Sequence, residues 1–152
     1  MIHEDNVFRS VTLSELKEVA HDIVSRLDQF KIWLFRGEMG AGKTTLIKEI
    51  CRAAGIKEGT SSPTFSIVNE YQTSDANKIF HFDFYRIKQE IEAADIGTEE
   101  YFDSGYPCFV EWAEKIPSFI PSRFAEVTIA VETYTQRTIA ISLHDGKKEN
   151  RI

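Results

Sequence analysis

The sequence predicts a single α/β domain, with a mixed, mostly parallel central sheet flanked by helices and a C-terminal β-hairpin. Three observations support this fold class. The apolar run KIWLF at 31–35 leads into the glycine-rich stretch GEMGAGKT at 37–44. Apolar residues at helical spacing follow at 45–54. Finally, the segments 125–134 and 136–143 alternate like two strands joined by a tight turn.

The first expected element is a helix that precedes the first core strand. Thr12 and Glu15 fit the capping box T-x-x-E, and apolar residues then repeat at helical spacing from 16 to 27. The strand at 31–35 comes next, and the helix at 45–54 follows the glycine-rich stretch.

The middle of the chain predicts two more strands and a helical region. The segments 65–71 and 79–85 are strand-like, and the turn chemistry of QTSDANK between them favours a hairpin. The charged segment 87–102 is expected to be helical in two pieces broken at Gly97. The apolar run at 107–112 predicts a further short strand before the C-terminal hairpin.

The glycine-rich stretch matches G-x-x-x-x-G-K-S/T through Gly37, Gly42, Lys43 and Thr44. Glycines let successive backbone N–H groups turn toward one point, and the start of the next helix adds its positive dipole end. Lys43 would reach the outer phosphates, and Thr44 would offer its hydroxyl to Mg²⁺. A simple tight turn is the alternative, but both flanks favour a phosphate-binding loop and hence a P-loop NTPase-type domain.

The expected nucleotide contacts extend through this loop and beyond it. The candidate binding residues are Glu38, Met39, Gly40, Ala41, Gly42, Lys43, Thr44, Thr45, Trp112 and Arg137. For Trp112, which follows Glu111, packing at an edge of the core is the alternative, and the residue pattern slightly favours it.

Length and composition set further bounds. The 152 residues suit one domain, which we expect to span 1–144, with a charged flexible tail at 145–152. No apolar run approaches the ~20 residues of a membrane span, and the first residues lack the apolar core of a secretory signal. Cys51 and Cys108 are expected to be small core residues in a reducing compartment, which predicts a cytoplasmic protein. The net charge of −6 argues against the chain binding nucleic acid by itself.

Two acids follow apolar strands and are candidates for holding metal. Asp83 follows IFHF, and Glu111 follows CFV. Parallel strands open onto a ligand edge at their carboxyl ends, where such acids bind Mg²⁺ or orient the attacking water. Which of the two binds the metal and which activates water stays open. The candidate metal ligands are therefore Thr44, Asp83 and Glu111.

Other polar residues have weaker signals. Thr64 lies about twenty residues past the loop, where nucleotide switches place a threonine that meets the γ-phosphate and metal. A Ser-Pro turn is its equally good alternative. His81 shares a face with Asp83 and is expected to be a core or hairpin residue. Arg86 and Arg137 are candidate cations near phosphates.

Four segments occur in one order: GEMGAGKTTLIKEI, SSPTFSIVNEY, HFDFYRI and FVEWAEKI. The loop is generic, whereas the combination of S-P-T-F, H-F-D-x-Y-R and E-W is much more specific. Together they resemble the TsaE family, small bacterial ATPases required for making threonylcarbamoyladenosine in tRNA, over roughly residues 12–143.

The resemblance implies a protein that binds ATP and ADP with Mg²⁺ and hydrolyses ATP slowly. It implies TsaD-like and TsaB-like partners, with ATP turnover resetting this transferase between catalytic rounds. Contact with tRNA would be indirect, through the complex, and no membrane is involved. The catalytic set that it implies is Lys43, Thr64, Asp83 and Glu111. Trp112 would lie beside the nucleotide, and the segment around Thr12 and Leu13 near the adenine.

Three other functions fit the loop. A small-molecule phosphotransferase needs an arginine-bearing lid, but the acidic segment 87–106 has only Lys88 as a cation. A GTP-driven switch needs an N-K-x-D stretch, which the chain lacks, so adenine is favoured. A nucleotide-stabilised scaffold would bind nucleotide without turnover.

Overall fold

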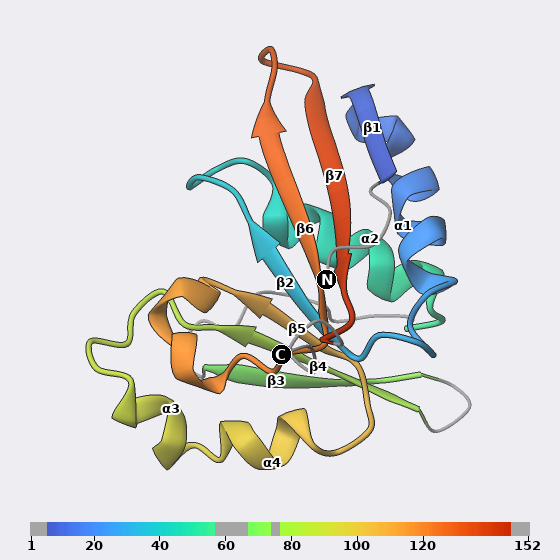
Figure 1. The fold of residues 1–152 in the computed structure, drawn as a ribbon. Helices are drawn as coiled ribbons and strands as arrows, with labels where there is room; N and C mark the ends of the chain where they lie inside the picture. The colour runs from blue at the N-terminus through green and yellow to red at the C-terminus, as the bar shows by residue number, and fades with distance from the viewer. Residues whose placement is uncertain (1–5, 57–66, 74–76, 147–152) are drawn as a thin grey trace, which may run out of the picture.

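The computed structural model describes residues 6–56, 67–73 and 77–146. Its described strands form one seven-stranded sheet in the order β1-β7-β6-β2-β5-β4-β3 (Figure 1). Four parallel strands make the centre: β6 (Phe124–Val131), β2 (Ile32–Arg36), β5 (Cys108–Glu111) and β4 (Lys78–Asp83). Antiparallel pairing adds β7 (Arg137–His144) and β1 (Asn6–Val11) on one side and β3 (Val68–Gln72) on the other.

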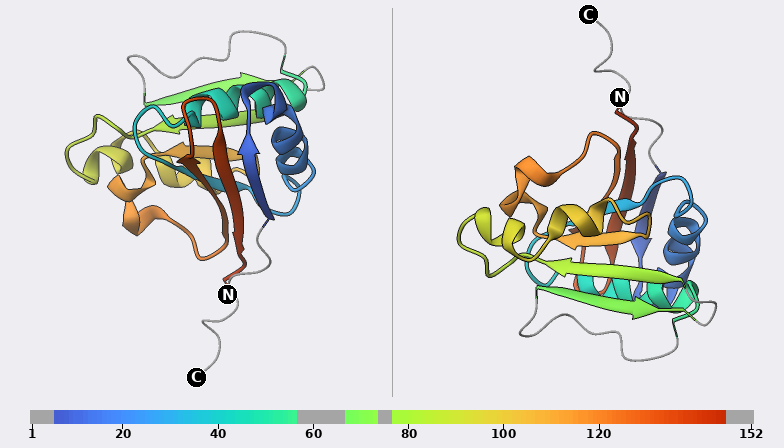
Figure 2. Two further views of the ribbon diagram at one scale, coloured as in Figure 1. Left: turned by 90° about the horizontal axis from the view of Figure 1, so that it is seen from above. Right: turned by 90° about the horizontal axis from the view of Figure 1, so that it is seen from below.

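Helices cover both faces of this sheet (Figure 2). On one face lie α1 (Leu16–Val24), which follows a 3₁₀ turn at Leu13–Glu15, and α2 (Lys43–Ala53). On the other face lie α3 (Ile91–Asp95) and α4 (Thr98–Phe102), with 3₁₀ turns at Ala113–Lys115 and Pro117–Phe119. No helix in the described ranges is long and apolar enough to cross a membrane.

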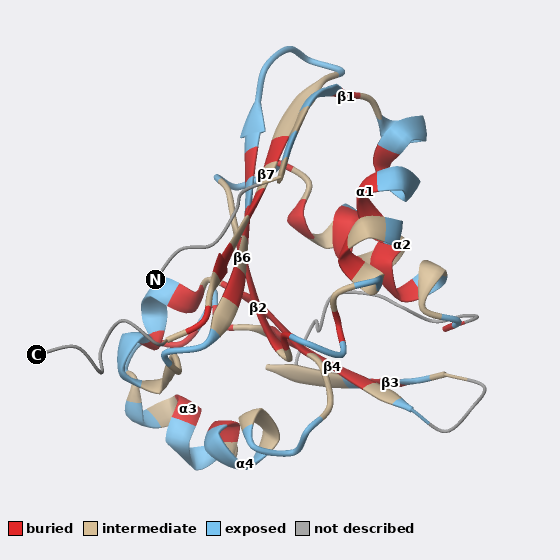
Figure 3. Ribbon diagram, turned by 45° about the vertical axis from the view of Figure 1, so that its right-hand side comes forward, coloured by how far each residue is buried: buried red, intermediate tan, exposed pale blue. Residues whose placement is uncertain are grey.

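Strand β2 shows why the sequence folds in this way. Its side chains alternate between two cores, with Trp33 and Phe35 facing α1 and α2, and Ile32 and Leu34 facing the opposite layer. All four are buried, as expected of a central strand covered on both faces (Figure 3). This uninterrupted burial fixes β2 in the middle of the sheet, so the loop that follows it emerges at the centre of the sheet edge.

Most of the predicted elements are present. The β3–β4 and β6–β7 hairpins are antiparallel pairs, and the helical region at 87–102 breaks at Gly97, whose φ is 84°. The capping box is also present, with the Thr12 N–H donating to Glu15 Oε1 at 2.9 Å. These features depend on local chemistry, which is why sequence patterns find them.

Strand β1 was not expected from the sequence. It pairs with β7 at the far end of the chain, from Asn6 opposite Ile141 to Val11 opposite Arg137. A register shift interrupts this pairing, and Ser10 within it has a φ of 56°. This edge strand buries only Val11 fully, so it carries little of the apolar pattern that marks a strand.

Candidate nucleotide-binding site

The glycine-rich loop joins β2 to α2 at the carboxyl edge of the parallel strands. Gly40 and Gly42 have φ values of 84° and 114°, which favour glycine. At Gly37, an added Cβ would lie 2.9 Å from the Ile129 carbonyl oxygen, so the backbone passes too close to β6 for a side chain. The loop conformation therefore requires these glycines, and α2 begins at Lys43 with its N-terminus at the loop.

The Lys43 side chain folds back onto the first residue of the glycine-rich loop. Its ammonium donates to the Gly37 carbonyl oxygen at 2.6 Å and lies 4.0 Å from the centre of the Trp112 ring. The side chain is only 6% exposed, so its charge is largely removed from water. A buried cation beside backbone N–H groups is suited to bind an anionic ligand.

The three predicted metal ligands lie together. Strands β4 and β5 pair in a register that sets Asp83 opposite Glu111, and the Thr44 hydroxyl donates to Glu111 Oε2 at 3.1 Å. All three line a cavity of about 290 Å³, together with Lys43 and Trp112. Their role in metal binding stays a prediction, but the geometry it requires is present.

Electrostatics at this cavity favour a cation. Burial raises the pKa of Asp83, a hydrogen bond from the Tyr85 backbone N–H opposes that rise, and the nearby Glu111 carboxylate adds to it. The Lys43 ammonium in the same cavity lowers the pKa of Asp83. Two neighbouring carboxylates therefore gain from positive charge beside them, and Lys43 supplies part of it.

Glu111 also has a partner that sequence reasoning missed. His81 Nε2 lies 2.7 Å from Glu111 Oε2, and its Nδ1 lies 3.1 Å from the Tyr71 hydroxyl. The expectation of a core or hairpin residue at His81 is confirmed, since it is 1% exposed on β4 of the β3–β4 hairpin, but its contact with the candidate site was not expected. Alternation placed His81 on the face of Asp83, yet only the pairing of β4 with β5 brings it to Glu111.

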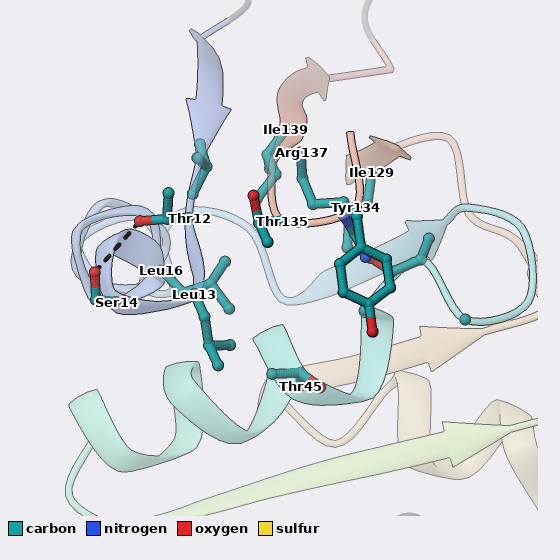
Figure 4. A pocket seen from close by; sticks show the side chains of 14 residues that line it. Thr12, Leu13, Ser14, Leu16, Thr45, Ile129, Tyr134, Thr135, Arg137 and Ile139 are labelled. Atoms are coloured by element: carbon teal, nitrogen blue, oxygen red, sulfur yellow. Dashed lines mark hydrogen bonds between the residues drawn. The ribbon is translucent and has the colours of Figure 1, made fainter. Parts of the chain in front are cut away.

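A second, larger cavity of about 540 Å³ lies on the other side of the loop (Figure 4). Residues from β1, the following 3₁₀ turn, the start of α2 and the β6–β7 hairpin line it. Gly40, Gly42 and Thr45 line both cavities, so the loop separates them. Thr12 and Leu13, expected near the adenine, lie in this larger cavity. Its wall also contains two residues that the sequence did not indicate, Tyr134 and Thr135.

Arg137 connects the loop to the hairpin. Its Nε donates to the Ala41 carbonyl at 2.8 Å, and one terminal nitrogen donates to the carbonyls of Thr133 at 3.0 Å and Gln136 at 3.1 Å. The guanidinium therefore orients the loop backbone while lining the larger cavity.

The remaining predicted residues are placed as follows. Met39 lines the smaller cavity and Ala41 the larger one, whereas the exposed Glu38 lines neither. Arg86 is exposed beyond β4 and lines neither cavity. Thr64 lies outside the described residues.

Known proteins share both this sequence and this fold. A family model for the threonylcarbamoyl adenosine biosynthesis protein TsaE matches residues 10–139. The tRNA threonylcarbamoyladenosine biosynthesis protein TsaE of Bacillus subtilis is 34% identical over 142 residues, covering 93% of this chain and 88% of that protein. The protein of the same name from Rickettsia typhi is 34% identical over 137 residues, covering 90% of each.

A solved structure agrees with the fold. The crystal structure of Bacillus subtilis YdiB matches with a TM-score of 0.78 at 27% identity, covering 98% of this chain and 91% of that one. The predicted α/β fold is thereby confirmed. Since the family model spans most of the sequence and relatives above 30% identity cover nearly all of it, the chain belongs to the TsaE family of threonylcarbamoyl adenosine biosynthesis proteins.

Proposed function

We propose that this protein binds ATP and ADP with Mg²⁺ and hydrolyses ATP slowly when alone. The observation that carries the proposal is the convergence of Lys43, Thr44, Asp83 and Glu111 on one cavity beside the loop. A cation for phosphates, a hydroxyl and two carboxylates are the parts that phosphoryl transfer uses for positioning and charge stabilisation.

The donor set suits Mg²⁺. Carboxylate and hydroxyl oxygens are hard ligands, and Mg²⁺ is commonly held by one or two carboxylates, substrate phosphates and water. Thr44, Asp83 and Glu111 would hold it, and when bound it would neutralise charge developing on the phosphates. A threonine hydroxyl can offer a lone pair to a cation while it donates its proton in a hydrogen bond to a carboxylate, so the Thr44–Glu111 hydrogen bond is compatible with this role.

The larger cavity supports binding of the nucleoside part. It adjoins the loop through Gly40, Gly42 and Thr45, so a nucleotide whose phosphates follow the loop would have its base and sugar there. Its wall combines apolar side chains such as Leu13 and Ile139 with hydroxyl groups such as Thr12. This mixture suits a flat base attached to a polar sugar.

In the cell, we propose that ATP turnover resets a TsaD–TsaB-like transferase between rounds of tRNA modification in the cytoplasm. Family membership supports this assignment. The net charge of −6 suits a subunit that leaves tRNA contact to its partners. Thr64 remains the proposed switch threonine.

One experiment tests the proposal. TsaD-like and TsaB-like proteins and tRNA are combined with the wild-type chain, Lys43→Ala or Lys48→Ala, and modified adenosine and phosphate release are measured over several turnovers. Lys48 is the matched control, since it lies on α2 but lines neither cavity.

We expect wild type and Lys48→Ala to sustain modification and Lys43→Ala to stop after about one round. Calorimetry on the isolated chain should show a loss of ATP affinity of about 10- to 100-fold for Lys43→Ala, the usual cost of a charge-assisted hydrogen bond. Equal modification with Lys43→Ala, or without the chain, would contradict the proposal.

A further inference from the structure

A hydrogen-bonded chain runs from the edge hairpin to the loop helix. The Tyr71 hydroxyl on β3 lies 3.1 Å from His81 Nδ1 on β4, and His81 Nε2 lies 2.7 Å from Glu111 Oε2 on β5. The same carboxylate oxygen accepts from the Thr44 hydroxyl on α2 at 3.1 Å. Tyr71, His81 and Glu111 are 7%, 1% and 3% exposed, so water scarcely competes for these bonds.

The chemistry of these groups gives the bonds one consistent direction. An ionised carboxylate only accepts, so His81 Nε2 must carry the proton that faces Glu111. In a neutral imidazole, Nδ1 is then an acceptor, and it matches the hydroxyl proton of Tyr71. The Glu111 carboxylate therefore sets the ring tautomer, and the Tyr71 hydroxyl complements it by donating to Nδ1.

We propose that His81 is a positioning residue for ATP hydrolysis, an inference that rests on the proposed function. His81 lines neither cavity and acts through Glu111, whose carboxylate it holds toward Thr44. Tyr71 supports His81, because its hydroxyl bonds the other ring nitrogen and so holds the orientation of the imidazole ring.

The burial of Glu111 makes such support necessary. A carboxylate that is 3% exposed needs hydrogen-bond donors to hold it in one orientation. Without the imidazole, the Thr44 hydroxyl would be the one side-chain donor to this carboxylate among the described residues. A cation beside Thr44 and Asp83 would then meet a less fixed carboxylate. Removing a residue that orients the ligands of a metal typically lowers metal affinity or activity by about 10- to 100-fold.

The test compares His81→Leu, His81→Gln and Tyr71→Phe with wild type. Glutamine keeps an N–H donor at a reach similar to that of Nε2, leucine keeps only the bulk, and Tyr71→Phe removes one hydroxyl. His21→Leu is the control, since His21 is exposed on α1, away from both cavities. Three quantities are measured: the affinity for ADP without Mg²⁺, the gain in ATP affinity that Mg²⁺ produces, and the single-turnover hydrolysis rate.

We expect all variants to bind ADP without Mg²⁺ within about 2-fold of wild type, since the loop is intact. His81→Leu should lower the rate by about 10- to 100-fold and reduce the gain from Mg²⁺, and His81→Gln should recover most of both. Tyr71→Phe should lower the rate by about 2- to 10-fold, as for loss of one neutral hydrogen bond. A purely structural role would instead lower all three quantities in His81→Leu and His81→Gln alike, and that result would overturn the inference.

A spectroscopic measurement tests the hydrogen-bond direction without any turnover. Nitrogen–proton correlation spectra of the histidine rings should show His81 protonated at Nε2 in the wild-type chain and also in Tyr71→Phe, because the Glu111 acceptor is present in both. Protonation at Nδ1 in the wild type, or a His81→Leu rate equal to that of wild type, would refute the role of His81. Failure of the wild-type chain to bind ATP would refute the proposed function instead, so the two failures are distinguishable.

Discussion

The Lys43 ammonium lies 4.0 Å from the centre of the Trp112 ring while it donates to the Gly37 carbonyl oxygen at 2.6 Å. Trp112 has a φ of 63°, an unfavourable value for a large side chain, and this turn directly after Glu111 brings its ring to Lys43. Phosphate oxygens are stronger partners for an ammonium than either a carbonyl or an aromatic face. Nucleotide binding should therefore draw Lys43 away from the ring.

This contact predicts which tryptophan reports nucleotide binding. Trp33 is fully buried in the core, and its indole N–H donates to the Phe30 carbonyl at 2.7 Å. We expect ATP to change the emission of the wild-type chain and of Trp33→Phe, and to leave that of Trp112→Phe unchanged. Fluorescence titrations with ATP and GTP measure the effect and the base preference together. A full response in Trp112→Phe would show that the signal comes from elsewhere.

Arg137 offers a second test, directed at the loop backbone. Its planar guanidinium reaches the carbonyls of Ala41, Thr133 and Gln136 at once, a geometry that the single ammonium of lysine cannot reproduce. We expect Arg137→Lys to weaken ATP binding by about 10-fold, the cost of about one charged hydrogen bond, with an unchanged circular dichroism spectrum. Calorimetry measures the affinity.

The control for this variant is Arg123→Lys. Arg123 also donates to a carbonyl, that of Gln29 at 2.8 Å, but lines neither cavity. If both variants bind ATP as wild type does, the loop does not depend on Arg137.

The sequence was sufficient where local chemistry decides the structure. A buried strand, a glycine turn and an amphipathic helix follow one another without interruption around Lys43, so that unit could be recognised directly. Asp83 and Glu111 could be assigned to one edge because each ends an apolar strand, and parallel strands end together.

Long-range pairing decided what the sequence did not reveal. Strand β1 meets β7 from the opposite end of the chain, and this pairing carries Thr12 and Leu13 to the same cavity as Tyr134. The bond between His81 and Glu111 likewise depends on β4 lying beside β5. No periodicity within a short window encodes either relationship.

The two cysteines give a prediction about reactivity. Cys51 and Cys108 are fully buried, and burial raises the pKa of each thiol to about 12. Because the thiolate is the reactive form, we expect the native chain to resist a maleimide at pH 8 and to react at both sites in guanidinium. Mass spectrometry counts the labels. Lys17→Cys, at an exposed position on α1, should label at once, and equally fast labelling of native Cys51 or Cys108 would contradict their burial.

Asp83 links stability to the proposed chemistry. Burial raises its pKa above 3.8, so the folded chain holds this proton more tightly than the unfolded chain does. The stabilising contribution is therefore present at low pH and is lost as pH rises through the raised pKa, which leaves the ionised carboxylate as a net cost at pH 7. Asp83→Asn removes that charge and keeps an oxygen for the Tyr85 N–H, so we expect a higher Tm at pH 7 without nucleotide.

The same substitution should lower Mg²⁺-dependent turnover by at least about 10-fold, because it removes a charge proposed to face the metal. Thermal unfolding from pH 7 down toward pH 4 measures the first effect, and the gain in Tm should shrink over that range as the wild-type carboxyl becomes protonated. Asp95→Asn, at an exposed position on α3, should show neither effect. A gain that is the same at every pH would mean that the charge of Asp83 is not its source, and a lower Tm at pH 7 would mean that the ionised carboxylate stabilises the fold. If Asp83→Asn raises the Tm and lowers turnover, then the Asp83 carboxylate serves function at a cost to the stability of the fold.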